Sequence, residues 1–362
     1  MEPTFSLQNN TELENPLSPL PLPVTFVCRY SENWSELFLP SQEPLPAPDS
    51  LYGRIANNED CWIVLTYLHL KRRQLNVQLS TSFTPGAICV ASTLDFGIKD
   101  YTFNSFVVGC RGDGPKPLLC DFTIVQNQAN IESETDALMP LWPQHGLIPR
   151  DRGRGNRIEN VVFKGGEVNL YEEFRSPQFR QELERLGVRL VVDGRTEDKP
   201  VNWHDYSNAD LVLAVRDLTE QDALVKPPSK LINAWIAGVP ALLGPEPAFQ
   251  QLKRLQLDYI EVRTPQDALD AIRRLQQEPS LYQQMIANGF QRAEAFTVER
   301  IAQQWRDIFA GPVAQQYVRW RERTQISRMG EFVFRSFRQK RANATAEYNR
   351  KHGYRIISGK VT

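Results

Sequence analysis

Short apolar runs of strand length alternate with longer segments of helical length along most of this chain. Residues 24–28 (VTFVC) form the first such run, and residues 58–72 have helical length with Asn58 as a candidate N-cap. Four strand-length runs follow that segment: LNVQLS, GAICVAS, NSFVVGC and DFTIVQN. This alternation predicts an α/β layer with a largely parallel sheet.

The same alternation restarts after residues 128–157, a polar segment with prolines and little periodicity that we interpret as the interdomain linker. A helix is expected over residues 171–186, and Thr264 with Pro265 supplies an N-cap and an N1 proline for a later one. The strands expected between the helices are ENVVFKGG, VRLVVDG, ADLVLAVRD, PALLG and DYIEV. Two successive α/β units predict paired Rossmann-like domains facing a cleft.

These breaks divide the chain into four predicted parts. Residues 1–22 form an extended leader, residues 23–150 and 151–312 form the two Rossmann-like domains, and residues 313–362 form a basic C-terminal helix and tail. A chain of 362 residues exceeds the size at which one hydrophobic core usually stops growing, which agrees with two domains.

Composition and charge narrow the class of protein. Hydrophobic content of 41% and charged content of 23% are typical of a packed globular protein, and a formal charge of -1 gives no reason to expect a nucleic-acid partner. The five cysteines lack C-x-x-C spacing, so reduced thiols are expected. No signal peptide or run of 18 apolar residues is found, and we expect a cytoplasmic protein.

Glycines and cations gather where ligands bind in open α/β sheets, at the carboxyl ends of strands. Gly165 follows one predicted strand of the second half, and Arg216 follows another. Lys230 falls in the first turn of the helix SKLINAWIAG, with Lys226 just before it. Cations are unfavourable at a helix N-terminus unless an anion such as phosphate lies between them and the free amides. Solvated surface lysines remain the alternative.

The segment SKLINAWIAGVPALLGP resembles the donor-binding helix and following strand of glycosyltransferase-B (GT-B) enzymes, notably the E-K-L-x-N-A-L-x-A-G-x-x-P-V-V-L-G-P signature of α-1,3-fucosyltransferases. Ser229 stands at the glutamate position of that signature, and Lys230 matches its lysine. Residues 140–310, about half the chain, are also similar to bacterial, often cyanobacterial, glycosyltransferases with W-P-Q-x-G-L-I-P-R-D, present at 142–151, and K-P-x-S/T-K-L-I-N-A-W-x-A-G-V-P-A.

The resemblance implies a GT-B fold and transfer of a sugar from a nucleotide-diphosphate sugar to a hydroxyl acceptor. It further implies a role in polysaccharide or glycoconjugate biosynthesis, with a saccharide or lipid-linked saccharide as acceptor and no cofactor beyond the donor substrate. Residues 23–150 would then take the acceptor and residues 151–312 the nucleotide sugar. The helix that begins near residue 313 would cross back to the first domain.

The chain departs from retaining GT-B enzymes at their E-x7-E pair, where it has Val225 and Asn233. Ser229 and Asn233 stay candidate donor contacts through their place in the matching segment. Glu246, just beyond the strand PALLG, is the candidate for the ribose contact, with a surface glutamate as the alternative.

Arginines in the predicted linker are further candidates for the donor site. The guanidinium groups of Arg150 and Arg154 suit diphosphate oxygens and would stabilise a departing nucleotide diphosphate without metal. The chain has no D-x-D sequence, so we expect metal-independent transfer and no metal site. Solvated arginines are the alternative.

An inverting transfer needs a proton acceptor in the first domain. Asp113, in the loop after NSFVVGC, is the first candidate, and Asp95 is the next; an ordinary Asp-Gly turn is the alternative for Asp113. His145 and His204 have no metal-ligand spacing.

Two other functions stay open: a nucleotide-sugar 2-epimerase, which uses a similar double fold, and a non-catalytic module that binds nucleotide sugars or proteins. The C-terminal stretch RMGEFVFRSFRQKR mixes aromatic and basic residues, a composition suited to weak peripheral contact with the anionic inner face of a membrane. Packing of these aromatics onto the first domain is the alternative.

Overall fold

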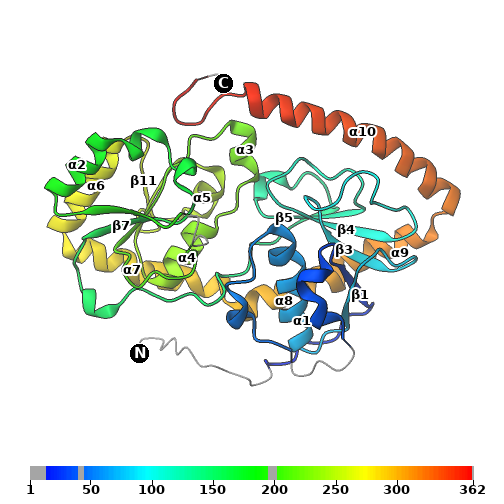
Figure 1. The fold of residues 1–362 in the computed structure, drawn as a ribbon. Coiled ribbons are helices and arrows are strands. Elements are labelled where there is room, and N and C mark those ends of the chain that lie inside the picture. The colour runs from blue at the N-terminus through cyan, green and yellow to red at the C-terminus, as the bar shows by residue number, and fades with distance from the viewer. Residues whose placement is uncertain (1–13, 40–44, 195–201, 361–362) are drawn as a thin grey trace.

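A computed structural model describes residues 14–39, 45–194 and 202–360 of the 362-residue chain. Two parallel β-sheets, each flanked by helices, lie side by side along the long dimension of the molecule (Figure 1). The predicted α/β class with two doubly wound units is confirmed.

The first sheet has six parallel strands in the order β2-β1-β3-β4-β5-β6. Their bounds are Val24–Val27 (β1), Val77–Ser80 (β2), Ile88–Ser92 (β3), Phe106–Arg111 (β4), Phe122–Val125 (β5) and Asp136–Leu138 (β6). The prediction missed β6, which lies within the segment interpreted as linker. This strand has only three residues and follows the polar run ESET, so it shows no apolar periodicity.

The helix predicted over residues 58–72 is present, but its first turn is wider than an α-helix. A π-helical turn, Asp60–Val64, leads into α1, Leu65–Arg72. Asp60 accepts hydrogen bonds from the backbone N–H groups of Ala56 and Asn57 and from the Trp34 indole, which fixes the start of the helix.

The second sheet has five parallel strands in the order β11-β10-β9-β7-β8. Their bounds are Asn160–Phe163 (β7), Arg189–Val192 (β8), Leu211–Ala214 (β9), Ala241–Leu243 (β10) and Ile260–Glu261 (β11). In both sheets the first strand lies between the second and the third. The strand order therefore reverses at β1/β3 and at β7/β9, which are the places where open α/β sheets bind ligands.

Helices cover both faces of the second sheet. Their bounds are Pro177–Arg185 (α2), Glu220–Val225 (α3), Ser229–Ala237 (α4), Pro247–Leu252 (α5), Pro265–Gln277 (α6) and Pro279–Ala293 (α7). The helix predicted from residue 171 begins only at Pro177, because Ser176 caps it there. The predicted N-cap Thr264 forms a capping box with Asp267.

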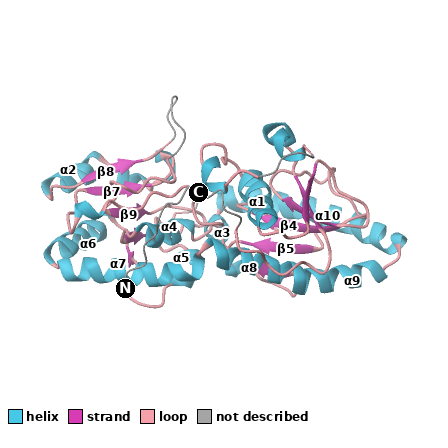
Figure 2. Cartoon of the chain, turned by 90° about the horizontal axis from the view of Figure 1, so that it is seen from below, coloured by secondary structure: helices cyan, strands magenta, loops and turns pink. Residues whose placement is uncertain are grey.

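The chain then crosses back to the first domain through α8 (Val298–Ile308) and α9 (Ala314–Glu322), which Figure 2 shows against the first sheet. Ile301, Trp305 and Trp320 are buried in the first hydrophobic core, with Trp305 packed edge-on against Trp62. The predicted division assigned residues up to 312 to the second domain, but the crossing already begins with α8. The other predicted domain boundaries, near residues 23 and 151, stay predictions.

The described part of the predicted leader also belongs to the first core. Leu20 is buried there, and Leu17 and Leu22 pack partly against it. Residues 1–13 lie outside the described residues. Segment 14–22 has no regular secondary structure yet is packed, because its leucines cover apolar surface.

A helix of 28 residues, α10 (Gln325–His352), runs back from the first domain toward the second (Figure 1). At about 1.5 Å per residue it spans roughly 42 Å. Its buried Gln339 bonds to the backbone of Leu118 and Lys116, and Phe332 packs on Phe103. Within the described ranges, no helix is long and apolar enough to cross a membrane.

Candidate functional site

Three loops of the second domain meet at the carboxyl edge of its sheet, where the strand order reverses. Gly165 follows β7, Arg216 follows β9 and Glu246 follows β10, while Lys230 lies in the first turn of α4. The ammonium of Lys230 lies 5.8 Å from the ring of Phe163, the last residue of β7, and is influenced electrostatically by Arg216 and Glu246. These segments therefore form one cluster of charges.

Arg216 is held by a buried carboxylate. Its Nε lies 2.8 Å from Oε1 of Glu246, and its second nitrogen pairs with Oε2, so the contact is bidentate. Glu246 is fully buried and both of its oxygens are occupied. This placement corrects the two expectations for Glu246, a ribose contact or a surface glutamate: the residue orients Arg216.

Lys230 is the under-compensated cation of the cluster. Its ammonium lies 4.7 Å from the centre of the Trp203 ring, and in the described part of the chain it has no hydrogen bond or ion pair. Burial lowers the pKa of Lys230 to about 7, and neighbouring Arg216 lowers it further than Glu246 restores it. A phosphate at this position would restore the charge balance.

Trp203 was missed by the sequence analysis. It is a single aromatic residue in the polar stretch NWHDYS, and periodicity gives no signal for such a position. Its ring contact with Lys230 depends on the packing of a loop that lies 27 positions away in the chain.

Asp113 lies at the junction of the two domains. Its Oδ2 is 2.6 Å from the ammonium of Lys226, and its Oδ1 accepts a hydrogen bond of 2.9 Å from Gln126. Gln126 also donates to the carbonyl of Val225, and Asn127 donates to that of Lys226, so the two domains are in contact here. Asp113 thus lies at the same rim as Lys226 and Lys230. Its carboxylate could accept a proton only after the ammonium of Lys226 has moved away from it.

Asp95, the second candidate base, lies after β3, where the strand order of the first sheet reverses. Its carboxylate accepts a hydrogen bond of 2.5 Å from Ser92. Burial raises the pKa of Asp95, and burial likewise raises that of the fully buried Glu59 nearby. A raised carboxyl pKa suits proton uptake near neutral pH.

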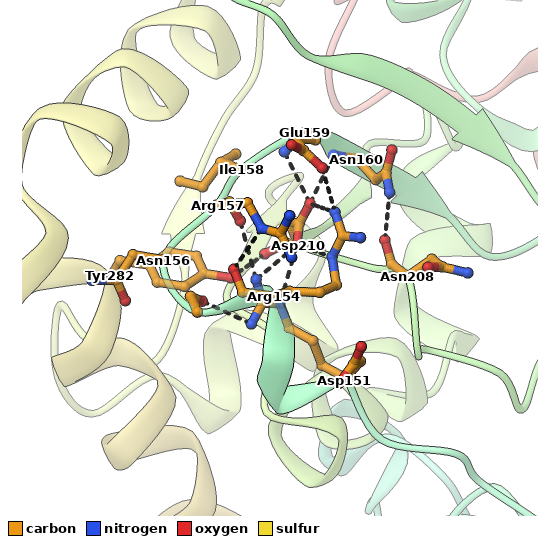
Figure 3. A network of polar contacts seen from close by, with 12 residues as sticks. Asp151, Arg154, Asn156, Arg157, Ile158, Glu159, Asn160, Asn208, Asp210 and Tyr282 are labelled. Atoms are coloured by element: carbon orange, nitrogen blue, oxygen red, sulfur yellow. Dashed lines mark hydrogen bonds and ion pairs between the residues drawn. The ribbon is translucent and has the colours of Figure 1, made fainter.

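Arg150 and Arg154 lie at the opposite edge of the second sheet. Both guanidinium groups contact Asp210, which is fully buried just before β9. Figure 3 shows Arg154 beside this carboxylate. Arg150 contacts Oδ1 at 2.8 Å and Arg154 contacts Oδ2 at 2.7 Å, and two backbone N–H groups complete the network. Burial raises the pKa of Asp210, but these hydrogen bonds outweigh it and the pKa is lowered.

This geometry corrects the expectation that Arg150 and Arg154 bind the donor. They neutralise a buried carboxylate at the amino ends of the strands, whereas the reversal-point loops lie at the carboxyl ends. No local sequence pattern indicates Asp210 as their partner, because it lies 60 and 56 positions away in the chain.

The other candidates differ in their surroundings. Gly165 has φ of 144°, and a Cβ there would lie 3.3 Å from the Phe163 ring, so only glycine fits this turn. Ser229 is the first residue of α4, beside Lys230. Asn233 is buried, and its side-chain oxygen accepts a hydrogen bond of 3.1 Å from the backbone N–H of Gln144. Asn233 thus fixes the linker motif instead of facing the rim.

The two histidines of this region lie in the linker contacts between the domains. Burial lowers the pKa of His145 to about 4 and also lowers the pKa of His204, whose ring packs 4.2 Å from that of Tyr52. Both are therefore neutral at pH 7. Over the described ranges no three His, Cys, Asp or Glu side chains form a metal-binding group.

A cavity of about 480 Å³ adjoins Arg216. It lies between the loop after β7, the loop after β9 and the C-terminal tail. Its lining comprises Val168–Glu172, Arg175, Arg216–Leu218, Arg355, Ser358 and Lys360. The size falls within the range typical of small-molecule sites.

No protein-family model and no curated protein sequence matches this chain. Among solved structures, it is similar to Anabaena HepE in complex with UDP, at 13% identity over 80% of this chain and 100% of that chain, with a TM-score of 0.45. It is similar to an α1,3-fucosyltransferase with GDP-fucose, at 11% identity, 83% and 94% coverage and a TM-score of 0.45. TarM matches at 10% identity over 62% of this chain, with a TM-score of 0.45; the chain spans about half of TarM, 55%.

Proposed function

We propose that the protein is a glycosyltransferase that moves a sugar from a nucleotide-diphosphate sugar to a hydroxyl acceptor in polysaccharide or glycoconjugate biosynthesis. The observation that carries the proposal is the convergence of Arg216, Lys226 and Lys230 at the reversal point of the second sheet and the N-terminus of α4. Three cations there fit a diphosphate, because one is paired to a buried glutamate and Lys230 has no ion pair among the described residues.

The cations would act on the leaving group. Cleavage of the bond between sugar and diphosphate places negative charge on the diphosphate, which Lys230 and Arg216 would stabilise in a partly dehydrated site. Glu246 holds Arg216 in position for this role. We propose that these fixed cations allow transfer without a metal ion.

Asp113 is the proposed proton acceptor for the acceptor hydroxyl, with Asp95 as the second candidate. Donor phosphates that attract Lys226 would release Oδ2 of Asp113 from its ion pair, so donor binding would expose the base. Asp113→Asn should then lower turnover at saturating donor while leaving donor affinity nearly intact. Unchanged turnover in Asp113→Asn would make Asp95 the candidate proton acceptor.

The test of the function is a binding screen followed by a transfer assay. Selective binding stabilises the folded state, so thermal shifts with UDP-, GDP-, dTDP- and CMP-sugars identify the donor. Transfer of labelled sugar from that donor to saccharide or lipid-linked saccharide acceptors then supports the proposal. Donor epimerised without acceptor would indicate a 2-epimerase, and donor bound but neither transferred nor changed would indicate a binding module.

We further propose peripheral contact between α10 and an anionic membrane on the cytoplasmic side. Phe334 and Phe337 are 60% and 64% exposed, so the alternative of packing onto the first domain holds for Phe332, which contacts Phe103, and not for these two. At 100° per residue they share one outward face with Ile326, Met329 and Val333. The cations of α10 outnumber Glu331 and Glu347: Arg328, Arg335, Arg338, Lys340, Arg341, Arg350 and Lys351.

An exposed apolar face with basic flanks fits a lipid surface of opposite charge. Co-sedimentation with phosphatidylserine-containing vesicles at low salt should fall in the double variant Phe334→Ser/Phe337→Ser. Leu255→Ser, at an exposed leucine of the second domain, is the control. Equal binding by all three proteins, or none by the wild type, would contradict the membrane role.

A further inference from the structure

The C-terminal tail after α10 pairs with the loop that follows β9. Arg355 forms an antiparallel bridge with Thr219. The N–H of Glu220 donates to the carbonyl of Tyr354 at 2.9 Å, and the N–H of Ile356 donates to that of Leu218 at 2.9 Å. The tail therefore ends on the second domain, although α10 begins on the first (Figure 1).

Asp217, the neighbour of Arg216, holds this tail. Its carboxylate accepts hydrogen bonds from the N–H groups of Ile357 and Ser358 at 3.2 and 3.1 Å, and from the Ser358 hydroxyl at 2.7 Å. The guanidinium of Arg355 also donates to the carbonyl of Asp217, and Ile357 packs against the second hydrophobic core. These contacts fix the tail at the carboxyl edge of the second sheet.

The docked tail leaves the adjoining cavity open and lines one side of it. Its Arg355, Ser358 and Lys360 belong to the wall of the 480 Å³ cavity, which Arg175 and Arg216 also line. Among the residues that the structure describes, the buried Arg175 Nε has no hydrogen-bond partner and Lys360 has no ion pair.

The charges of this cavity favour an anion. Four cations line it against the carboxylates of Glu172 and Asp217, and the tail's own N–H groups already occupy Asp217. Arg216 belongs both to the cavity wall and to the cluster around Lys230. A ligand with several phosphates is therefore able to contact both.

We propose that residues 353–360 line one side of the donor site, and that Arg355 and Lys360 bind the phosphate groups of a nucleoside diphosphate. This inference rests on the proposed function and adds a third segment to the site. The tail supplies two cations that neither α/β unit contains, and Asp217 positions them. Asp217 is therefore a positioning residue.

The test uses the full chain and calorimetric titration with UDP and GDP. The double variant Arg355→Gln/Lys360→Gln should bind the nucleoside diphosphate recognised by the wild type about 10- to 100-fold more weakly, because two charge-assisted contacts are lost. Lys351→Gln is the matched control: it removes a cation near the end of α10 that forms an ion pair with the exposed Glu347, and the affinity of this variant should be unchanged.

A second variant separates tail position from tail charge. Asp217→Ala keeps Arg355 and Lys360 but removes the anchor, so it should weaken nucleoside diphosphate binding by a similar factor and make residues 353–360 sensitive to proteolysis. Thermal unfolding checks that each variant stays folded.

The outcomes distinguish this inference from the proposed function. Wild-type binding with unchanged affinity in the double variant would overturn the tail's role and leave the proposed function standing. Tighter binding by either tail variant would show that the tail obstructs the site, which also overturns the inference. A wild type that binds no nucleoside diphosphate and no nucleotide sugar would overturn both.

Discussion

The two ends of the second sheet carry cation clusters of similar composition and different character. At the amino ends, Arg150 and Arg154 share the buried carboxylate of Asp210, which also accepts two backbone hydrogen bonds. At the carboxyl ends, Arg216 has Glu246, whereas Lys230 lies over the rings of Phe163 and Trp203 and has no ion pair among the described residues. The amino-end cluster is satisfied within the protein, and the carboxyl-end cluster is not.

This difference gives a criterion for choosing candidate ligand contacts among many arginines and lysines: whether a buried cation has an anionic partner within the fold. A buried charge needs a partner, and a group whose partner lies within the fold contributes to folding. A partly buried cation without such a partner is unfavourable in the unliganded protein. Binding of an anion removes this unfavourable free energy, which therefore adds to the affinity for the anion. Four experiments compare the two clusters, and they are ordered by the size of the change that we expect.

Asp210→Ala should produce the largest change, and it should affect folding. Removing the shared buried carboxylate leaves two neighbouring guanidinium groups, of which Arg154 keeps its ion pair with the half-exposed Glu159. We expect a loss of about 3–5 kcal/mol in the free energy of unfolding. Urea denaturation measures it. The control Asp270→Ala removes an exposed carboxylate paired with Arg273 and should cost less than about 1 kcal/mol. Equal losses in the two variants would remove the contrast.

Lys230→Met should affect binding and not folding. Loss of one charge-assisted contact to phosphate should weaken donor binding by about 1.5–3 kcal/mol, roughly 10- to 150-fold. The free energy of unfolding should stay equal or rise, because the variant no longer buries an uncompensated charge. Calorimetry and urea denaturation give the two values. Lys253→Met, at a lysine 4.5 Å from the Tyr259 ring, is the control and should keep full donor affinity.

The pH dependence of donor binding should follow Lys230. Its pKa in the unliganded protein is lowered to about 7, so the side chain is charged below that pH and neutral above it. Binding a diphosphate above pH 7 then requires proton uptake, and affinity should fall by up to about tenfold per pH unit between pH 7 and 9. Titrations of wild type and Lys230→Met at each pH measure the slope. A slope that persists in the variant would assign the titration to another group.

Asp113→Asn should have the smallest effect on folding. Its ion pair with Lys226 joins the two domains at a site where the aspartate side chain is 44% exposed. Exposed pairs contribute about 0–1 kcal/mol, so the free energy of unfolding should change by no more than that. Urea denaturation at low and high salt measures it. A loss above about 2 kcal/mol would place Asp113 in the same structural class as Asp210.

Most of the elements could be predicted from the sequence alone, together with the sheet edge at which Gly165, Arg216 and Lys230 lie. Apolar runs and local capping, such as Thr264 with Asp267, depend on neighbours within a few positions, so most strands and the start of α6 were predictable. The order of strands and helices was sufficient to predict where Lys230 and Arg216 would lie, because loops after parallel strands share one edge. The three-residue β6 escaped because it is too short for a periodic signal.

Which of these charges have a partner within the fold depends on contacts between residues that lie far apart in the sequence. Arg150 and Asp210 lie 60 positions apart, Arg216 and Glu246 lie 30 apart, and Asp217 meets Ser358 across 141 positions. Such partners are brought together by the order of strands in the sheet and by the path of α10 from the first domain to the second. Neither can be predicted from patterns among neighbouring residues. The free energy of a buried charge depends on the groups within a few ångströms of it, and folding alone selects those groups.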